Sequence, residues 1–176
     1  MGDGGFRPAD NGQLTTEVGS GIVVGVAVTN QGSDRFELEP LVERLTSRYG
    51  RAPAEVLVEG GYPTNEEISA LAACGTRVYA PPLPPRNRER DPARTRPSGP
   101  PAVAEWWTRM ATPRGQVHLS PAGQPRRVDQ CPRPQPGLQH LAVRGLARVR
   151  AIFLWFALAH TVAQGLLLVR RAEVAA

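Results

Sequence analysis

Residue types that build disulfides and metal sites are scarce in this sequence. Among its 176 residues are only two cysteines, Cys74 and Cys131, and their spacing fits neither a metal site nor a disulfide framework. The three histidines, at positions 118, 140 and 160, form no cluster. The first residues lack the apolar core of a signal peptide. These absences argue against a disulfide-stabilised secreted domain and predict reduced thiols in a cytoplasmic protein.

Proline, glycine and positive charge are abundant instead. The chain has 18 prolines and 18 glycines, and its formal net charge is +5. A basic chain is compatible with a polyanionic partner such as DNA. The length is sufficient for one ordinary domain with a hydrophobic core.

The first half of the chain alternates between strand patterns and helix patterns. Strands are expected at 11–17, 22–29, 56–58 and 77–80, and the first two form a hairpin. Helices are expected after Asp34, which would cap the first, and after Thr64 or Asn65, which would cap the second. The first helix places its apolar residues on one face and ends at Gly50. This order predicts an α/β (α+β) fold with one mixed sheet and helices packed on it.

The second half changes character. Residues 81–102 are rich in proline and arginine and predict a mobile loop. A helix is expected from Val103 to Met110, whereas 113–137 match no structural element. The segment 138–171 is predicted to be helical. The chain therefore divides into 1–80, 81–102, 103–137 and 138–171.

The apolar run from Ala151 to Val169 allows two interpretations. Arginines flank it, and its length is just enough to span a bilayer. His160 and Gln164 interrupt it, and polar side chains are costly in lipid. We therefore expect a buried helix of a soluble domain and no membrane partner, with a tail anchor as the alternative.

Glu59 is the candidate functional residue of the first half. It follows the strand at 56–58 and precedes Gly60 and Gly61, which let the chain turn. A carboxylate at the carboxyl end of a strand lies at the edge where α/β folds place their chemistry. The alternative is a solvated strand end without function.

Several short stretches, in this order, resemble a bacterial insertion-sequence transposase of the DDE class. They are G-G-F-R-P-A-x-N at 4–11, V-x-V-T-N-x-G-S-D at 26–34, R-Y-G-R-x-P at 48–53, V-x-G-G-Y at 58–62, M-A-T-P at 110–113 and V-R-G-L-A-R-V-R-A-I-F-L-W-F-A-L-A-H at 143–160. The resemblance covers most of 2–115 and 137–168. Each motif is weak alone, and their order and spacing carry the resemblance.

The resemblance implies an incomplete ribonuclease-H-like mixed sheet and the function of DNA transposition. In that family two Asp and one Glu hold two divalent ions, normally Mg²⁺, which activate water or a 3′-hydroxyl for attack on a DNA phosphodiester. Carboxylates suit this role because Mg²⁺ prefers hard oxygen ligands. The implied partner is DNA at the transposon ends, with a homodimer in the parent family and a cytoplasmic or nucleoid location.

The catalytic set that the resemblance implies is incomplete. Glu59 stands at the position of the family's second Asp, and the family's first Asp lies on a strand upstream of the first residue here. The third carboxylate belongs within 117–136, where the resemblance vanishes. A shifted reading frame would explain this, because codons compatible with Arg127 and Val128 contain a Glu codon one base later. We therefore expect a chain without transposase activity.

Two other hypotheses remain open beside the inactive transposase. The chain could be a non-catalytic DNA-binding remnant, or a small tail-anchored membrane protein. Residues whose charge suits contact with DNA phosphates are Arg86, Arg88, Arg90, Arg94, Arg96, Arg144 and Arg148. For each one the alternative is a solvated surface charge.

Overall fold

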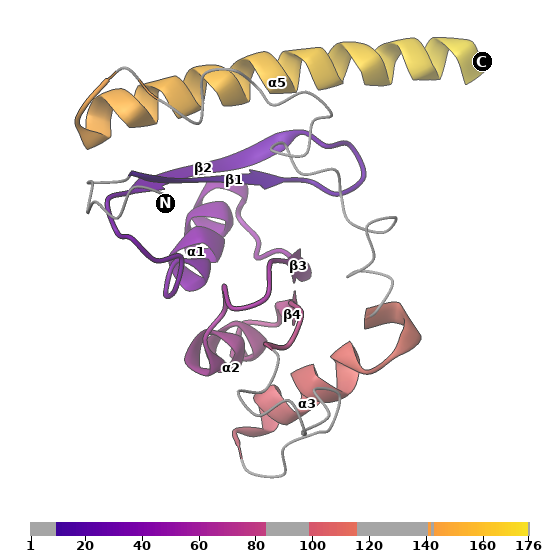
Figure 1. The fold of residues 1–176 in the computed structure, drawn as a ribbon. Helices are drawn as coiled ribbons and strands as arrows, with labels where there is room; N and C mark the ends of the chain where they lie inside the picture. Colours follow the sequence, from indigo (N-terminus) through magenta and orange to yellow (C-terminus); the bar gives the residue numbers. More distant parts are fainter. Residues whose placement is uncertain (1–9, 84–98, 116–140, 142, 176) are drawn as a thin grey trace. The chain divides into compact units, whose positions relative to one another are not determined.

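The computed structural model describes residues 10–83, 99–115, 141 and 143–175, which fall into two compact units (Figure 1). The first unit contains the described residues up to Ser33 together with 141 and 143–175, and the second contains 34–83 and 99–115. Arg86, Arg88, Arg90, Arg94 and Arg96 lie outside the described residues, as does the stretch 117–136 for which a frameshift is predicted. Most of the predicted 81–102 loop also lies outside them.

The first unit is built on the predicted hairpin. Strand β1 (Asn11–Thr16) pairs antiparallel with β2 (Val23–Thr29), and Gly12 lies opposite Val28. The turn between them is closed by Glu17, whose carboxylate accepts hydrogen bonds from the amides of Gly19 and Ser20. A hydrogen bond from the Ser20 hydroxyl is the main cause of a lowered pKa of the Glu17 carboxyl, and the two amide bonds lower it further. The hairpin expected from the alternating pattern is therefore confirmed.

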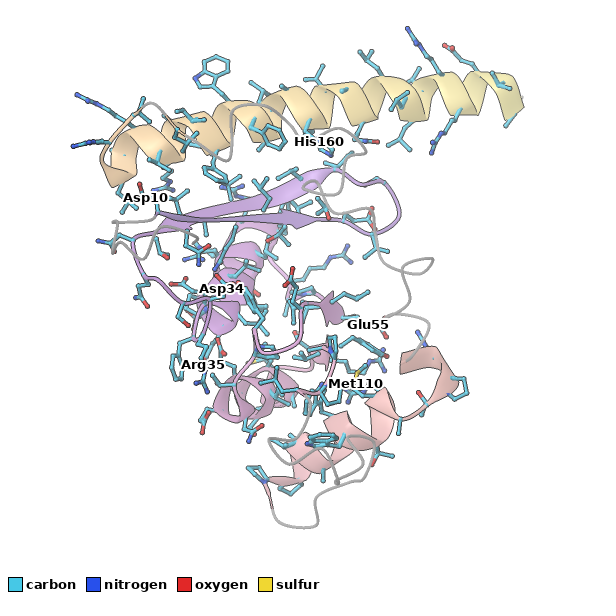
Figure 2. The ribbon with its side chains drawn as sticks, viewed as in Figure 1. Asp10, Asp34, Arg35, Glu55, Met110 and His160 are labelled. Carbon is cyan, nitrogen blue, oxygen red and sulfur yellow. The ribbon has the colours of Figure 1, made fainter. Side chains whose placement is uncertain are left out.

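Helix α5 (Leu146–Ala175) lies along this hairpin (Figure 1). The ring of Phe153 lies against Gly12, where any side chain on residue 12 would overlap it. Further along the helix, Nε2 of His160 lies 3.0 Å from the carbonyl oxygen of Gly21, in the hairpin turn (Figure 2). One side of α5 is thus packed on the hairpin.

The second unit alternates helices and short strands. Helix α1 (Leu38–Tyr49) is followed by β3 (Glu55–Leu57), α2 (Asn65–Ala73), β4 (Arg77–Tyr79) and α3 (Pro101–Met110). Gly50 ends α1 in the left-handed conformation, as its sequence position predicted. Strand β3 pairs with β4 in parallel, so β3, α2 and β4 form one β-α-β unit.

The core of the second unit lies where α1, α2 and α3 meet the parallel pair. Each of these elements contributes apolar side chains that are buried together. They are Leu38 and Val42 of α1, Val56 of β3, Ile68 and Leu71 of α2, Val78 of β4, and Val103, Trp106 and Met110 of α3. The apolar residues of α1 recur at helical spacing, which explains why this face is buried. The mixed α/β fold class predicted from the sequence is confirmed.

Three local expectations are wrong. The described strands form two separate two-stranded sheets instead of one mixed sheet, because no described strand pairs with both β1 and β3. Helix α1 starts at Leu38, with no side-chain cap from Asp34. The segment 151–169 is helical as expected, but it is not a buried helix. Val149 and Ala157 are the buried residues of α5, because one narrow hairpin covers only one of its sides.

Candidate functional site

Glu59 lies at the carboxyl end of the parallel pair in the second unit. The amide of Val58 still donates to the carbonyl oxygen of Tyr79, at 2.9 Å, so the pairing with β4 continues to the residue before Glu59. Both strands of a parallel pair end at the same edge. Glu59 therefore leaves the sheet at the edge where β4 also ends, and it is exposed to solvent.

A tight turn fixes the chain directly after Glu59. The amide of Tyr62 donates to the carbonyl oxygen of Glu59, at 3.2 Å, and Gly61 has a φ of 84°. A positive φ at the third position is typical of a type II turn and favours glycine. At Gly60, a Cβ atom would lie 2.9 Å from the backbone oxygen of Pro81. Both glycines are therefore needed for this turn, one for its conformation and one for close packing.

Helix α2 begins shortly after this turn with a capping box. Thr64 is the N-cap, and its hydroxyl accepts a hydrogen bond from the amide of Glu67, while Glu67 accepts one from the amide of Thr64. The cap predicted from the sequence is confirmed. It determines where the chain leaves the turn and enters the helix.

Three acidic residues of the second unit act on the hydroxyl of Tyr62. Burial, followed by the negative charges of Asp34, Glu37 and Glu67, raises the pKa of the Tyr62 hydroxyl, and Arg44 opposes the shift. Burial and neighbouring negative charge both disfavour tyrosinate. Tyr62 therefore remains a neutral phenol at any physiological pH.

Sequence reasoning missed the role of the Glu67 carboxylate, which joins two helices. Its Oε1 accepts hydrogen bonds from the amides of Leu38, at 2.9 Å, and Glu39, at 3.2 Å. These amides belong to the first turn of α1, where no intrahelical partner exists. Glu67 is only 2% exposed. The capping-box pattern predicted its bond to Thr64, but no sequence pattern shows a partner 29 residues away.

Glu55 lies at the opposite, amino-terminal end of β3 (Figure 2). Its Oε1 lies 3.0 Å from a guanidinium nitrogen of Arg77 and 3.4 Å from one of Arg114. Both arginines are mostly exposed, so these pairs contribute little to stability. Glu55 is thus a half-buried, ion-paired residue, and it lies at the opposite end of the strand pair from Glu59.

The residues that the structure describes do not by themselves fit a magnesium ion. Nowhere among them do three or more His, Cys, Asp or Glu side chains come together in a way that could hold a metal. Protein sites for Mg²⁺ use one or two carboxylates together with substrate phosphates and water. Glu59 has a carboxylate of the required type, but no metal-binding group of three such side chains forms in the described part of the chain.

Comparison with family models, curated proteins and solved structures finds no match to this chain. Its function must therefore be inferred from its own residues.

The predicted DNA-contacting residues that are described lie in the first unit. Arg144 precedes Gly145, and Arg148 lies in the first turn of α5; both are exposed. The amides of Arg148 and Val149 donate to the carbonyl oxygen of Gly145. Glu59 belongs to the second unit, so within either unit Arg144 and Arg148 are not brought together with it.

Proposed function

We propose that this chain is a non-catalytic remnant of a DDE transposase, in which Glu59 occupies the place of one metal-binding carboxylate. The proposal is carried by the position of Glu59. It is an exposed carboxylate at the carboxyl edge of a parallel strand pair, held by a turn that requires both following glycines. Ligands and substrates of α/β sheets bind at this edge.

The arrangement of the strands supports the same proposal. Among the described strands β1 pairs with β2 alone, and β3 pairs with β4 alone. In the ribonuclease-H-like sheet that the sequence resembles, a central strand carrying the first Asp would join two such pairs. The described residues contain no strand in that role, and they form no group of three or more His, Cys, Asp or Glu side chains that could hold a metal ion.

The substitution of Glu for Asp supports loss of catalysis. Glu59 carries one methylene more than the family's Asp, which moves its carboxylate by more than about 1 Å, whereas productive geometry tolerates about 0.5 Å. We therefore expect binding of DNA through arginine side chains such as Arg144 and Arg148, and no cleavage.

The test begins with the DNA that flanks and encodes the chain. Translation in the shifted frames should recover an upstream strand with Asp and a Glu across the codons of Arg127 and Val128. A restored protein would then combine both segments with Glu59→Asp. We expect the restored protein to cleave DNA carrying the element's terminal repeats when Mg²⁺ or Mn²⁺ is present, and the chain as it stands to leave it intact.

Matched variants make this test decisive. The restored protein with Glu59→Asn should lose cleavage, whereas Glu43→Gln, which removes an exposed carboxylate of α1, should retain it. Cleavage by the unrestored chain would contradict the proposed loss of activity. A restored protein that folds and binds DNA but does not cleave would contradict the transposase origin of Glu59.

A further inference from the structure

The side of α5 that points away from the hairpin is a continuous apolar stripe. We define this outer face as the residues Ala151, Leu154, Trp155, Leu158, Val162, Leu166 and Val169. They recur at helical spacing and are all exposed, with Trp155 at 72%. Apolar surface of this extent on a soluble protein marks an interaction site.

The polar residues within the apolar run lie on the other side of the helix. His160 contacts Gly21 of the hairpin, and the side chain of Gln164 also lies near Gly21. The sequence suggested that these residues interrupt the run. In the folded unit they contact the hairpin, and the outer face contains no charged residue between Ala151 and Val169.

Arginines bracket this face at both ends. Arg150 precedes Ala151, and Arg170 and Arg171 follow Val169; all three are exposed. At about 1.5 Å per residue the stripe is about 28 Å long, so positive charge stands at both ends of an apolar strip. The occupant of the outer face must therefore be apolar along its length and negative at both ends.

A second copy of the chain does not meet this requirement. A parallel pair of α5 helices would place each arginine end against the same end of its partner, and an antiparallel pair would place Arg150 against Arg170 and Arg171.

An anionic bilayer surface does meet it. Acyl chains below the headgroups receive the apolar stripe, and lipid phosphates receive the arginines at both ends. Trp155 is suited to this interface because tryptophan concentrates at headgroup depth. We propose that the outer face of α5 docks on the surface of an anionic lipid bilayer, with the helix lying in the plane of the interface.

The hairpin contacts separate this arrangement from a spanning helix. By length and composition alone α5 is able to cross a membrane. Crossing would remove the Phe153 ring from Gly12 and would place His160 in lipid without its partner, the carbonyl oxygen of Gly21. A helix lying on the surface retains both contacts.

Vesicle flotation of the full chain tests the proposal. The chain should float with vesicles of phosphatidylcholine mixed with phosphatidylglycerol, and much less with phosphatidylcholine alone. Leu158→Glu should weaken binding about tenfold or more, because it buries one large apolar side chain less. The control Val18→Glu changes an exposed residue of the hairpin turn and should bind as the unmodified chain does.

Charge variants test the anionic part. Arg170→Gln and Arg171→Gln should each weaken binding about fivefold. The control variants Arg48→Gln and Arg51→Gln remove the same charge from exposed positions of the second unit. Their vesicle binding should fall only by the small amount that a lower net charge of the whole chain causes. Circular dichroism of each variant confirms that the helices are retained.

Four outcomes would overturn the proposal. The first two are no flotation with either vesicle type and equal flotation with neutral and anionic vesicles. The third is undiminished vesicle binding of Leu158→Glu. The fourth is resistance of the bound chain to extraction by alkaline carbonate, which would indicate a spanning helix. Concentration-dependent dimerisation that Leu158→Glu abolishes, without vesicle binding, would assign the outer face to a second copy instead.

Discussion

Replacing Glu67 tests whether a single carboxylate holds the second unit together. This carboxylate accepts hydrogen bonds from the amides of Leu38 and Glu39 in α1 and from the amide of Thr64 at the start of α2. In Glu67→Ala, three amides in a largely buried place lose their acceptor. Each unsatisfied buried amide costs about 1–3 kcal/mol, and water entering the vacated space offsets part of this. We expect a loss of about 3–5 kcal/mol from the free energy of unfolding.

That loss is a large share of the roughly 5–15 kcal/mol available to a domain, so a milder variant is needed. In Glu67→Gln, the side-chain oxygen at the Oε1 position keeps both hydrogen bonds to α1. The NH₂ group then takes the place of Oε2 and faces the amide of Thr64, which loses its acceptor. We expect a loss of about 1–3 kcal/mol. The control is Glu66→Gln, which changes an exposed residue of the same helical turn and should stay within about 0.5 kcal/mol.

Urea unfolding followed by circular dichroism gives the free energies, and hydrogen exchange of the Leu38 amide gives the mechanism. This amide has no intrahelical partner, so its protection reports the bond to Glu67 directly. Thr64→Ala provides the contrast, because it removes the cap hydroxyl of α2 at a cost of about 1 kcal/mol and should leave Leu38 protected. Equal stability of Glu67→Ala and Glu66→Gln, or unchanged protection of Leu38 in Glu67→Ala, would refute the argument.

Two further predictions follow from the packing of single residues. Gly12→Val should loosen α5 from the hairpin, because the new side chain overlaps the Phe153 ring, and hydrogen exchange along α5 measures this loosening. Adding Phe153→Ala to the same chain should restore the fit. The control is Gly32→Val, because Gly32 has open space around it. The raised pKa of Tyr62 predicts that the contribution of this residue to stability is constant below about pH 10, where unfolded tyrosine titrates. Above that pH the contribution falls by up to about 1.4 kcal/mol per pH unit, because the native state holds the phenolic proton more tightly. Urea unfolding across this pH range should show a smaller fall in the free energy of unfolding for Tyr62→Phe than for the unmodified chain. The chain contains no lysine, so the main competing titration at this pH is absent. An equal fall in both proteins would contradict the prediction.

The order of the elements follows from local pattern. Period-two and period-3.6 spacing of apolar residues predicted the hairpin, α1, β3, α2, β4 and α3, because side-chain direction along a strand or helix depends on local geometry. The glycine after α1 and the Thr64 cap were predictable for the same reason, since each acts within a few residues. The placement of Glu59 after β3 also needed only the sequence.

Tertiary structure alone decided how far each pattern is buried and which distant groups meet. The run 151–169 looks like a buried helix because it is largely apolar. Burial, however, depends on how much surface the rest of the chain provides, and the hairpin covers only one side of α5. The two sheets likewise could not be predicted, because strand pairing depends on partners far away in the sequence. The same holds for Glu67, whose bonds to Leu38 and Glu39 exist only because packing brings α2 to the first turn of α1. Local features of this protein, such as helix caps, turns and the order of the elements, can thus be predicted from its sequence. Its long-range contacts cannot, because they depend on the packing of whole elements.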